Sequence, residues 1–419
     1  MRWRCPLEFR EATLSNGLEI VAECNPRAYS MGVAYFVNTG SRDETDDIAG
    51  VSHFLEHMVF KGTPQRTADE VNRELDEIGS HSNAYTSEER TVYYSNLLPE
   101  LQERAVDLLS DLMRPSLREK DFDTEKQVII EEIYKYEDQP PFGAHEKCMN
   151  AYFGSHPLGR SILGTVESVT GLTSAAMRSY FERRYSPGNM TLVAAGRVEF
   201  EQLVAQAEQL CGGWQPFETH REAPSLAARH SMEVFVKDSA VQQYVVLMSP
   251  GPAASDNDRY AARVLGAVLG DDSGSRFYWD LVETGLAEYA VLASHEFQGA
   301  GIFMAFLCCT PEQTVGNLER IQRILSATEQ EGITESELIQ AKNKISAQIV
   351  LASERASNRL FAVGDGWTKR REYRTVKETV DAYQAVTLDD IRAVLDNYQL
   401  TQHTMVAVGP LTDLPDLRG

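Results

Sequence analysis

Short apolar runs and longer stretches with apolar residues three or four positions apart follow one another along the chain. The short runs predict strands and the longer stretches predict amphipathic helices. In the first half, strands are expected in residues 1–10, 14–21, 32–37, 83–86, 91–94 and 190–196. Helices are expected near residues 48–61, 67–78, 99–113, 119–138 and 173–184. The run at 14–21 contains Asn16-Gly17, a typical hairpin turn.

The second half repeats this order of elements. Strands predicted at 233–236 and 243–247 precede a helix near 257–269. Residues 185–196 align without gaps with residues 398–409, and Tyr, Thr, Val, Ala and Gly coincide. One match can arise by chance, but the shared element order favours an internal duplication. We therefore predict an α+β fold with two homologous domains, each a mostly antiparallel sheet covered by helices on one side.

The join between the two domains is predicted in residues 214–230. Trp214–Ser225 contains two prolines and little periodicity, which is typical of a linker. The first domain is then expected at 1–213 and the second at 231–419. Only the first contains the histidine motif described below.

Charge and cysteine usage narrow the possible functions. The net charge of −22 disfavours binding to nucleic acids or anionic membranes, which require basic patches. No stretch approaches the roughly 20 apolar residues of a membrane span. The first ten residues contain no apolar run typical of a signal peptide. The six cysteines form no Cys-x-x-Cys pair, which indicates a reducing compartment. A cytoplasmic location is expected.

The segment Gly50–Thr63 contains the candidate metal-binding and catalytic residues. Positions i, i+3 and i+4 of a helix share one face, so His53, Glu56 and His57 point into the same space. Two imidazoles one turn apart can bind a zinc ion at about 2.0–2.1 Å. The order His-x-x-Glu-His reverses the commoner His-Glu-x-x-His zinc helix. The alternative is a pair of surface histidines, but with 9 histidines in 419 residues this pattern arises by chance about once in fifty such chains.

A third ligand is expected on the helix predicted at 119–138. Glu125 and Glu132 are seven residues apart and therefore lie on one face. Glu132 can complete a His2Glu site, with water in the fourth position as a catalytic zinc requires. Glu131 is the alternative ligand from the pattern alone. Glu125 is expected to orient an imidazole N–H, although an exposed helix glutamate is the usual case.

These positions predict hydrolysis of peptide bonds. Zinc activates water and polarises the scissile carbonyl, and Glu56 acts as the general base. One zinc ion per chain is expected.

The sequence resembles the pitrilysin and mitochondrial-processing-peptidase family, the inverted zincins, over nearly its whole length. The resemblance is carried by Leu14–Leu18, His53–Thr63, Asn83–Thr86, Glu125–Glu132, His156–Arg160 and Pro187–Met190. It implies zinc ligands at His53, His57 and Glu132, the base at Glu56 and a supporting glutamate at Glu125. The resemblance thus favours Glu132 over Glu131 as the third ligand.

The resemblance also implies how substrate is bound. Asn83 and Ala84 match an edge strand that binds the substrate backbone by β-augmentation. The length resembles short bacterial-type members, in which each chain is half of a clam shell that closes as a dimer. The implied activity is that of a metalloendopeptidase acting on peptides or unfolded segments inside an enclosed chamber.

The second half departs from the family pattern. Active members usually have Arg-x-x-x-Gly-Leu-Ala-Tyr, whose arginine and tyrosine bind the substrate carbonyl. Here Val282 is read at the arginine position, and Glu288, which follows Gly285-Leu286-Ala287, is read at the tyrosine position. Tyr289 comes one residue late, and two residues instead of three separate Val282 from Gly285. Arg276 is one possible substitute. A heterodimer with a related chain that supplies the Arg/Tyr pair is favoured over a homodimer.

The alternative function is a non-catalytic assembly or scaffold subunit, like the structural members of the same family. Those members usually lose the zinc residues. All four are present here, which favours the peptidase.

Overall fold

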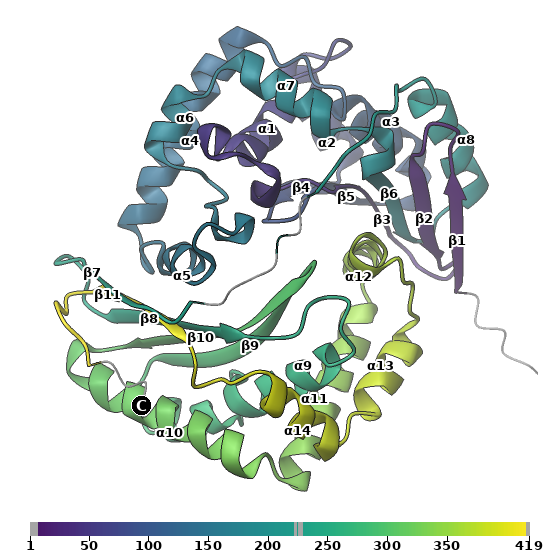
Figure 1. Ribbon diagram of the computed structural model, residues 1–419. Helices are drawn as coiled ribbons and strands as arrows, with labels where there is room; N and C mark the ends of the chain where they lie inside the picture. Colours follow the sequence, from purple (N-terminus) through teal and green to yellow (C-terminus); the bar gives the residue numbers. More distant parts are fainter. Residues whose placement is uncertain (1–6, 222–223, 225–228, 416–419) are drawn as a thin grey trace, which may run out of the picture. The chain divides into compact units, whose positions relative to one another are not determined.

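The computed structural model describes residues 7–221, 224 and 229–415 (Figure 1). It contains a six-stranded sheet and a five-stranded sheet, both packed against helices, so the predicted α+β class is confirmed. None of the helices in these ranges combines the length and the apolar composition that a membrane span requires.

The first sheet has the strand order β1-β2-β6-β3-β5-β4. Its strands are β1 (Glu8–Thr13), β2 (Glu19–Cys24), β3 (Met31–Val37), β4 (His81–Thr86), β5 (Thr91–Leu97) and β6 (Met190–Gly196). Neighbouring strands are antiparallel except for the β2–β6 pair. The main helices around it are α1 (Val51–Val59), α2 (Ala68–Ile78), α3 (Gln102–Leu112), α4 (Glu119–Asp138), α6 (Val166–Gly171), α7 (Ser174–Arg184), α8 (Phe200–Cys211) and α12 (Ala356–Arg370).

The second sheet has the order β7-β11-β8-β10-β9. Its strands are β7 (Met232–Val236), β8 (Gln243–Pro250), β9 (Tyr289–Phe297), β10 (Ala300–Cys309) and β11 (Thr404–Gly409). Its helices are α5 (Ala144–Phe153), α9 (Arg259–Gly270), α10 (Pro311–Glu331), α11 (Glu335–Ser353), α13 (Val376–Gln384) and α14 (Leu388–Asn397).

The two sheets repeat one topology, as the duplication predicts. The order β2-β6-β3-β5-β4 corresponds strand for strand to β7-β11-β8-β10-β9. The parallel pair occupies the same place in both, since β2 pairs with β6 and β7 pairs with β11 in parallel. The two segments aligned in the sequence end on the matching strands β6 and β11.

The chain forms two compact units, and each draws on both halves of the sequence. The first unit consists of the described residues within 1–134, 160–222 and 352–374. The second consists of those within 135–159, 223–351 and 375–419. This division differs from the boundaries expected at 213 and 231, because α5 belongs to the second unit and α12 to the first.

The exchanged helices cover the second face of each sheet. All seven residues of β3 are buried, so both of its faces need a cover. Tyr35 faces the core that includes α1, α3, α4 and α7, whereas Phe36 faces Leu360 and Val363 of α12. Figure 1 shows α1 and α4 on one side of this sheet and α12 on the other.

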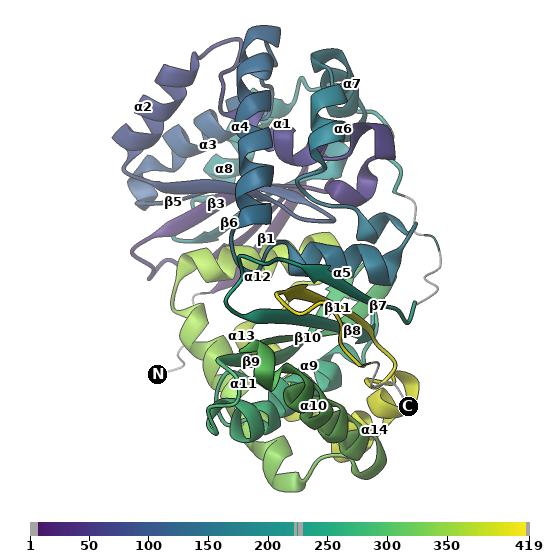
Figure 2. The same ribbon diagram turned by 90° about the vertical axis from the view of Figure 1, so that its left-hand side faces the viewer.

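The second unit has the same design. Leu247 on β8 packs with α9, α10 and α14, and its neighbour Met248 packs with α5. Figure 2 shows α5 and α10 on opposite sides of this sheet. The main helical layer was predicted on one side of each sheet, and a single exchanged helix is added on the other.

A buried ion pair attaches α12 to its sheet. Glu23 on β2 is 2% exposed and accepts hydrogen bonds from Arg359 Nε at 2.8 Å, from Arg359 Nη2, and from Tyr373 Oη at 2.9 Å. Removing one partner of such a pair leaves an uncompensated buried charge.

We expect Arg359→Met to lower the free energy of unfolding of the first unit by about 3–5 kcal/mol. Urea unfolding followed by circular dichroism measures the change. Arg355→Met is the matched control, because Arg355 is exposed at the start of the same helix. An Arg359→Met protein as stable as this control contradicts the role given to the ion pair.

Candidate metal centre

The start of α1 is fixed by a buried carboxylate. Glu44 accepts hydrogen bonds from the backbone N–H groups of Gly50 and Ser52, both at 2.7 Å. Burial raises the pKa of Glu44 to about 8, against the lowering effect of these hydrogen bonds. Gly50 has φ +90°, and a Cβ there would lie 2.5 Å from the Leu163 carbonyl oxygen. The helix that carries the histidines therefore begins at a defined position.

Aromatic stacking brings α4 against α1. The rings of Phe54 and Phe122 are 4.6 Å apart and inclined by 18°. Ile129 and Ile133, one and two turns from Glu125 along α4, are buried in the same core. Both views show α1 and α4 side by side (Figures 1 and 2). The helix predicted at 119–138 has these bounds, and Glu125 and Glu132 on it face the histidine helix.

Three donor atoms converge between the two helices. Glu132 Oε2 lies 3.8 Å from His53 Nε2 and 3.6 Å from His57 Nε2. All three ligand atoms lie within 4.8 Å of one another. Two atoms bound to one zinc ion are at most about 4.2 Å apart, so small side-chain movements suffice. The set of two imidazoles and one carboxylate therefore fits zinc.

The ring of His57 is held from behind. Its Nδ1 lies 2.9 Å from Glu125 Oε1, and Lys61 Nζ lies 2.6 Å from Glu125 Oε2. Glu125 is buried. An N–H at Nδ1 that donates to the carboxylate leaves the Nε2 lone pair facing Glu132. The structure thus places Glu125 behind the imidazole of His57.

Burial sets the protonation of the other groups. Burial, with a smaller effect of His57, lowers the pKa of His53 to about 3, so its imidazole is neutral. Burial also raises the pKa of Glu56. A hydrogen bond of 2.7 Å from the Thr86 hydroxyl to Glu56 Oε2 opposes this rise.

Asn83 and Ala84 lie on β4, the edge strand of the first sheet. Asn83 is exposed, and its Oδ1 accepts a hydrogen bond of 2.9 Å from the Ala84 N–H. Ala84 is buried against the core below α1. Thr86, two residues on and on the same face, reaches Glu56. The edge strand therefore ends beside the predicted base.

The stretch that departs from the family pattern lies in the second unit. Val282 ends a short helical turn and packs against that unit's core. Glu288 is exposed and accepts a hydrogen bond from Gln242. Tyr289 begins β9 and is 45% exposed.

Arg276 is engaged in a structural role. Its guanidinium donates to both Glu337 carboxylate oxygens at 2.7 and 2.9 Å and to Thr328 Oγ1 at 2.7 Å. These contacts occupy the side chain that was a possible substitute for the missing arginine.

Thr86, Lys61 and Glu44 were not assigned roles from the sequence. Thr86 and Lys61 stand inside the motifs quoted above, and Lys61 is one helical turn after His57. Their positions in these motifs could have marked them as candidate site residues. The contacts of Thr86 with Glu56 and of Lys61 with Glu125 arise only when the strand and the helices pack together.

Comparisons with known proteins agree with both halves of the fold. Residues 19–166 match the family model described as Insulinase (Peptidase family M16), and residues 171–345 match the one described as Peptidase M16 inactive domain. A protein of Mycobacterium tuberculosis, named as an uncharacterized zinc protease, is 31% identical over 96% of this chain and 93% of its own. A Bacillus subtilis protein with the same description is 30% identical over 96% of this chain and 98% of its own.

A solved protease structure from Helicobacter pylori has the same fold. It superposes with a TM-score of 0.89 at 22% identity and covers 96% of this chain and 100% of that one. Together with the matches to both family models and to full-length relatives, this shows that the chain belongs to the insulinase family of peptidases, M16.

Proposed function

We propose that this chain is a zinc-dependent metalloendopeptidase that hydrolyses peptides or unfolded segments. The observation that carries the proposal is the convergence of one ligand atom each from His53, His57 and Glu132 within 4.8 Å of one another. Membership of a family whose relatives are named as zinc proteases supports it.

The three converging side chains would hold one zinc ion, with His57 oriented by Glu125. A bound zinc supplies a Lewis acid that acidifies water and polarises a carbonyl. The neutral state of His53 favours ligation, because a protonated imidazole nitrogen has no lone pair to offer.

Glu56 would act as the general base and then as the general acid. It lies between the two histidines on α1, and burial moves its pKa upward, toward the range useful for proton transfer. Its carboxylate would accept a proton from the attacking water and deliver it to the leaving amine.

The edge strand β4 would bind the substrate main chain through Asn83 and Ala84. Only one side of this strand is paired within the sheet, so an extended peptide can add as a further strand. Main-chain hydrogen bonds give affinity with little sequence preference, which suits a peptidase of unfolded segments.

We further propose a dimer that encloses the chamber, with a related chain supplying the Arg/Tyr pair. Val282 and Glu288 cannot donate to a substrate carbonyl as arginine and tyrosine do. Losing one such donor costs about 2.7–4 kcal/mol of transition-state stabilisation. The cytoplasm, with no nucleic acid or membrane as partner, is the proposed setting.

The second candidate is a scaffold subunit, favoured only by the missing Arg/Tyr pair. Bound zinc without cleavage of any unstructured peptide, even with partner candidates added, would support it. The convergent donors beside a half-buried Glu56 have no use in that role, so we favour the peptidase.

We expect Glu132→Ala to weaken zinc binding by more than about 100-fold, since it removes a ligand rather than a supporting group. Competition with a fluorescent chelator measures the affinity. Glu131→Ala is the matched control, because Glu131 is the adjacent exposed residue on the same helix. A loss of zinc in the control, with none in Glu132→Ala, assigns the third ligand to Glu131.

We expect Glu56→Gln to retain zinc and lose about 10²–10⁴-fold in kcat, the usual contribution of a general base. Cleavage of a quenched fluorescent peptide measures turnover, and metal analysis checks zinc. Treatment of the parent with a chelator, followed by zinc, should abolish and restore activity. Unchanged cleavage by Glu56→Gln refutes the base assignment.

Addition of a family member that carries the Arg/Tyr pair, co-purified from the native host, should raise kcat about 10²–10³-fold. Light scattering and the peptide assay together record the assembly and its activity. Full activity of the purified chain alone, as a homodimer, contradicts the shared-site proposal.

A further inference from the structure

We propose that Thr86 is the positioning residue for Glu56: its hydroxyl selects the carboxylate orientation in which Glu56 acts as the base. The inference rests on the proposed function and adds a residue to it. Two features support this role: the contact of Thr86 with Glu56, and the loop at residues 38–44, which holds the segments that carry both residues.

The hydroxyl of Thr86 has one proton, and its neighbours direct that proton to Glu56. Thr86 Oγ1 lies 2.7 Å from Glu56 Oε2 and 3.4 Å from Thr91 Oγ1. Thr91 is fully buried and donates its own proton to the Thr39 carbonyl at 3.0 Å. An ionised carboxylate can only accept, so Thr86 donates its single proton in the short contact to Glu56 and not in the longer contact to Thr91.

A single hydrogen bond matters for Glu56 because this side chain has few other restraints. Within residues 7–221, 224 and 229–415, the Thr86 hydroxyl is its one hydrogen-bond donor. Engaging Oε2 leaves Oε1 to accept the proton. Without this contact the Glu56 carboxylate can rotate away from the point at which the ligand atoms of His53, His57 and Glu132 converge.

The loop at 38–44 holds the helix end of this contact. Glu44, its last residue, receives the N–H groups of Gly50 and Ser52 at the start of α1. Glu56 follows Ser52 by about one helical turn. The loop therefore fixes the axial position of the base.

The loop at 38–44 also contacts residues 87–89, which follow the end of β4 and therefore Thr86. Arg42 forms a buried ion pair of 2.6 Å with Glu89, and its backbone N–H donates to the Glu88 carbonyl at 2.8 Å. A Cβ on Gly40 would lie 2.1 Å from the Ser87 carbonyl oxygen, so the backbones touch here. Residues 87–89 directly follow Thr86, and their position determines where its hydroxyl points.

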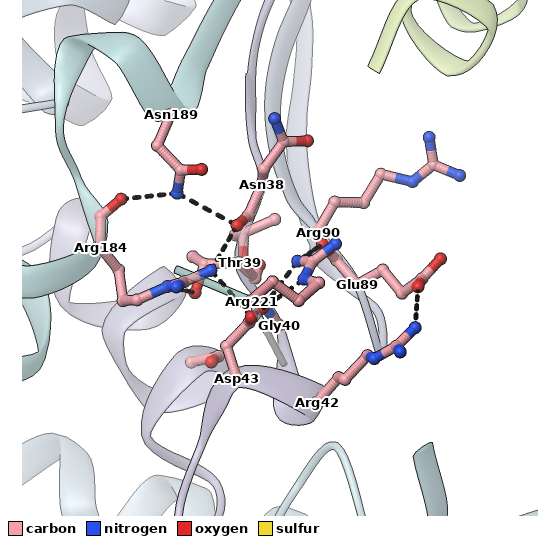
Figure 3. Close-up of polar contacts among 12 residues, drawn as sticks. Asn38, Thr39, Gly40, Arg42, Asp43, Glu89, Arg90, Arg184, Asn189 and Arg221 are labelled. Carbon is pink, nitrogen blue, oxygen red and sulfur yellow. Dashed lines mark hydrogen bonds and ion pairs between the residues drawn. The ribbon is translucent and has the colours of Figure 1, made fainter. Parts of the chain in front are cut away.

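The buried carboxylate of Asp43 holds the loop at 38–44 in place through ion pairs and a backbone hydrogen bond (Figure 3). Its carboxylate accepts from Arg184 at 2.8 Å, from Arg221 at 2.6 Å and from the Gly40 N–H at 3.1 Å. Arg221 also donates to the Glu89 carbonyl at 2.5 Å. A buried ionic network adds little net stability, so we attribute it to conformational specificity. The geometry that it maintains includes the Thr86–Glu56 distance.

The test compares Thr86→Val, which removes the hydroxyl at constant shape, with Thr86→Ser, which keeps it. We expect Thr86→Val to lower kcat by about 10–100-fold, as misplacement of a reacting group does, with KM and zinc affinity unchanged. Thr86→Ser should restore kcat to within about threefold of the parent. A general packing defect would not be rescued by serine, which lacks the methyl group.

Ser82→Ala is the matched control. Ser82 is on the same strand and face, but its hydroxyl bonds to Ser80 and Ser95 instead of Glu56. It should leave kcat unchanged. In the Glu56→Gln background, Thr86→Val should cost nothing further, since the two residues act as one unit.

The outcomes separate the two proposals. An active parent with unchanged kcat in Thr86→Val overturns the positioning role and leaves the peptidase intact. Loss of zinc affinity in Thr86→Val, or no rescue by serine, also overturns it. A parent that binds no zinc and cleaves no peptide, with any partner, overturns the proposed function and this inference with it.

Discussion

The candidate site depends on the packing of α4 against α1. Its donors come from segments about 75 residues apart in the sequence, so neither helix can form it alone. The stacked rings of Phe54 and Phe122 set the helices side by side, and buried Ile129 and Ile133 fix the rotation of α4. With that rotation, Glu125 and Glu132 face α1 while Glu131 is exposed. Apolar contacts therefore determine which glutamates reach the histidines.

The same core shifts the pKa values of the polar groups at the site. Taking carboxylates and imidazoles out of water disfavours their charged forms, which explains the raised pKa of Glu56 and the lowered pKa of His53. Glu125 differs in having a partner of opposite charge, because the Lys61 ammonium group forms an ion pair with its carboxylate. Neighbouring groups at the site therefore differ in environment. Some are buried without a charged partner, and others are paired with an opposite charge.

The sequence alone predicted the α+β class, the repeated element order and the grouping of His53, Glu56 and His57, because these depend on local periodicity. Choosing Glu132 over Glu131 required the family resemblance, since both lie on the helix and only the rotation of α4 distinguishes them. The contacts of Thr86 and Lys61 were not predicted. They join residues 30 and 64 positions apart, and no local pattern specifies such pairs. The exchange of α5 and α12 was missed for the same reason.

That exchange bears on how the duplicated halves depend on each other. Strands β3 and β6 are buried along their whole length, so each needs cover on both faces. The first half of the sequence supplies helices for only one face, and Leu360 and Val363 of α12 come from the second half. The second sheet needs α5 from the first half in return. A half without the other would expose an apolar sheet face to water, so each half depends on a helix from the other for its buried core.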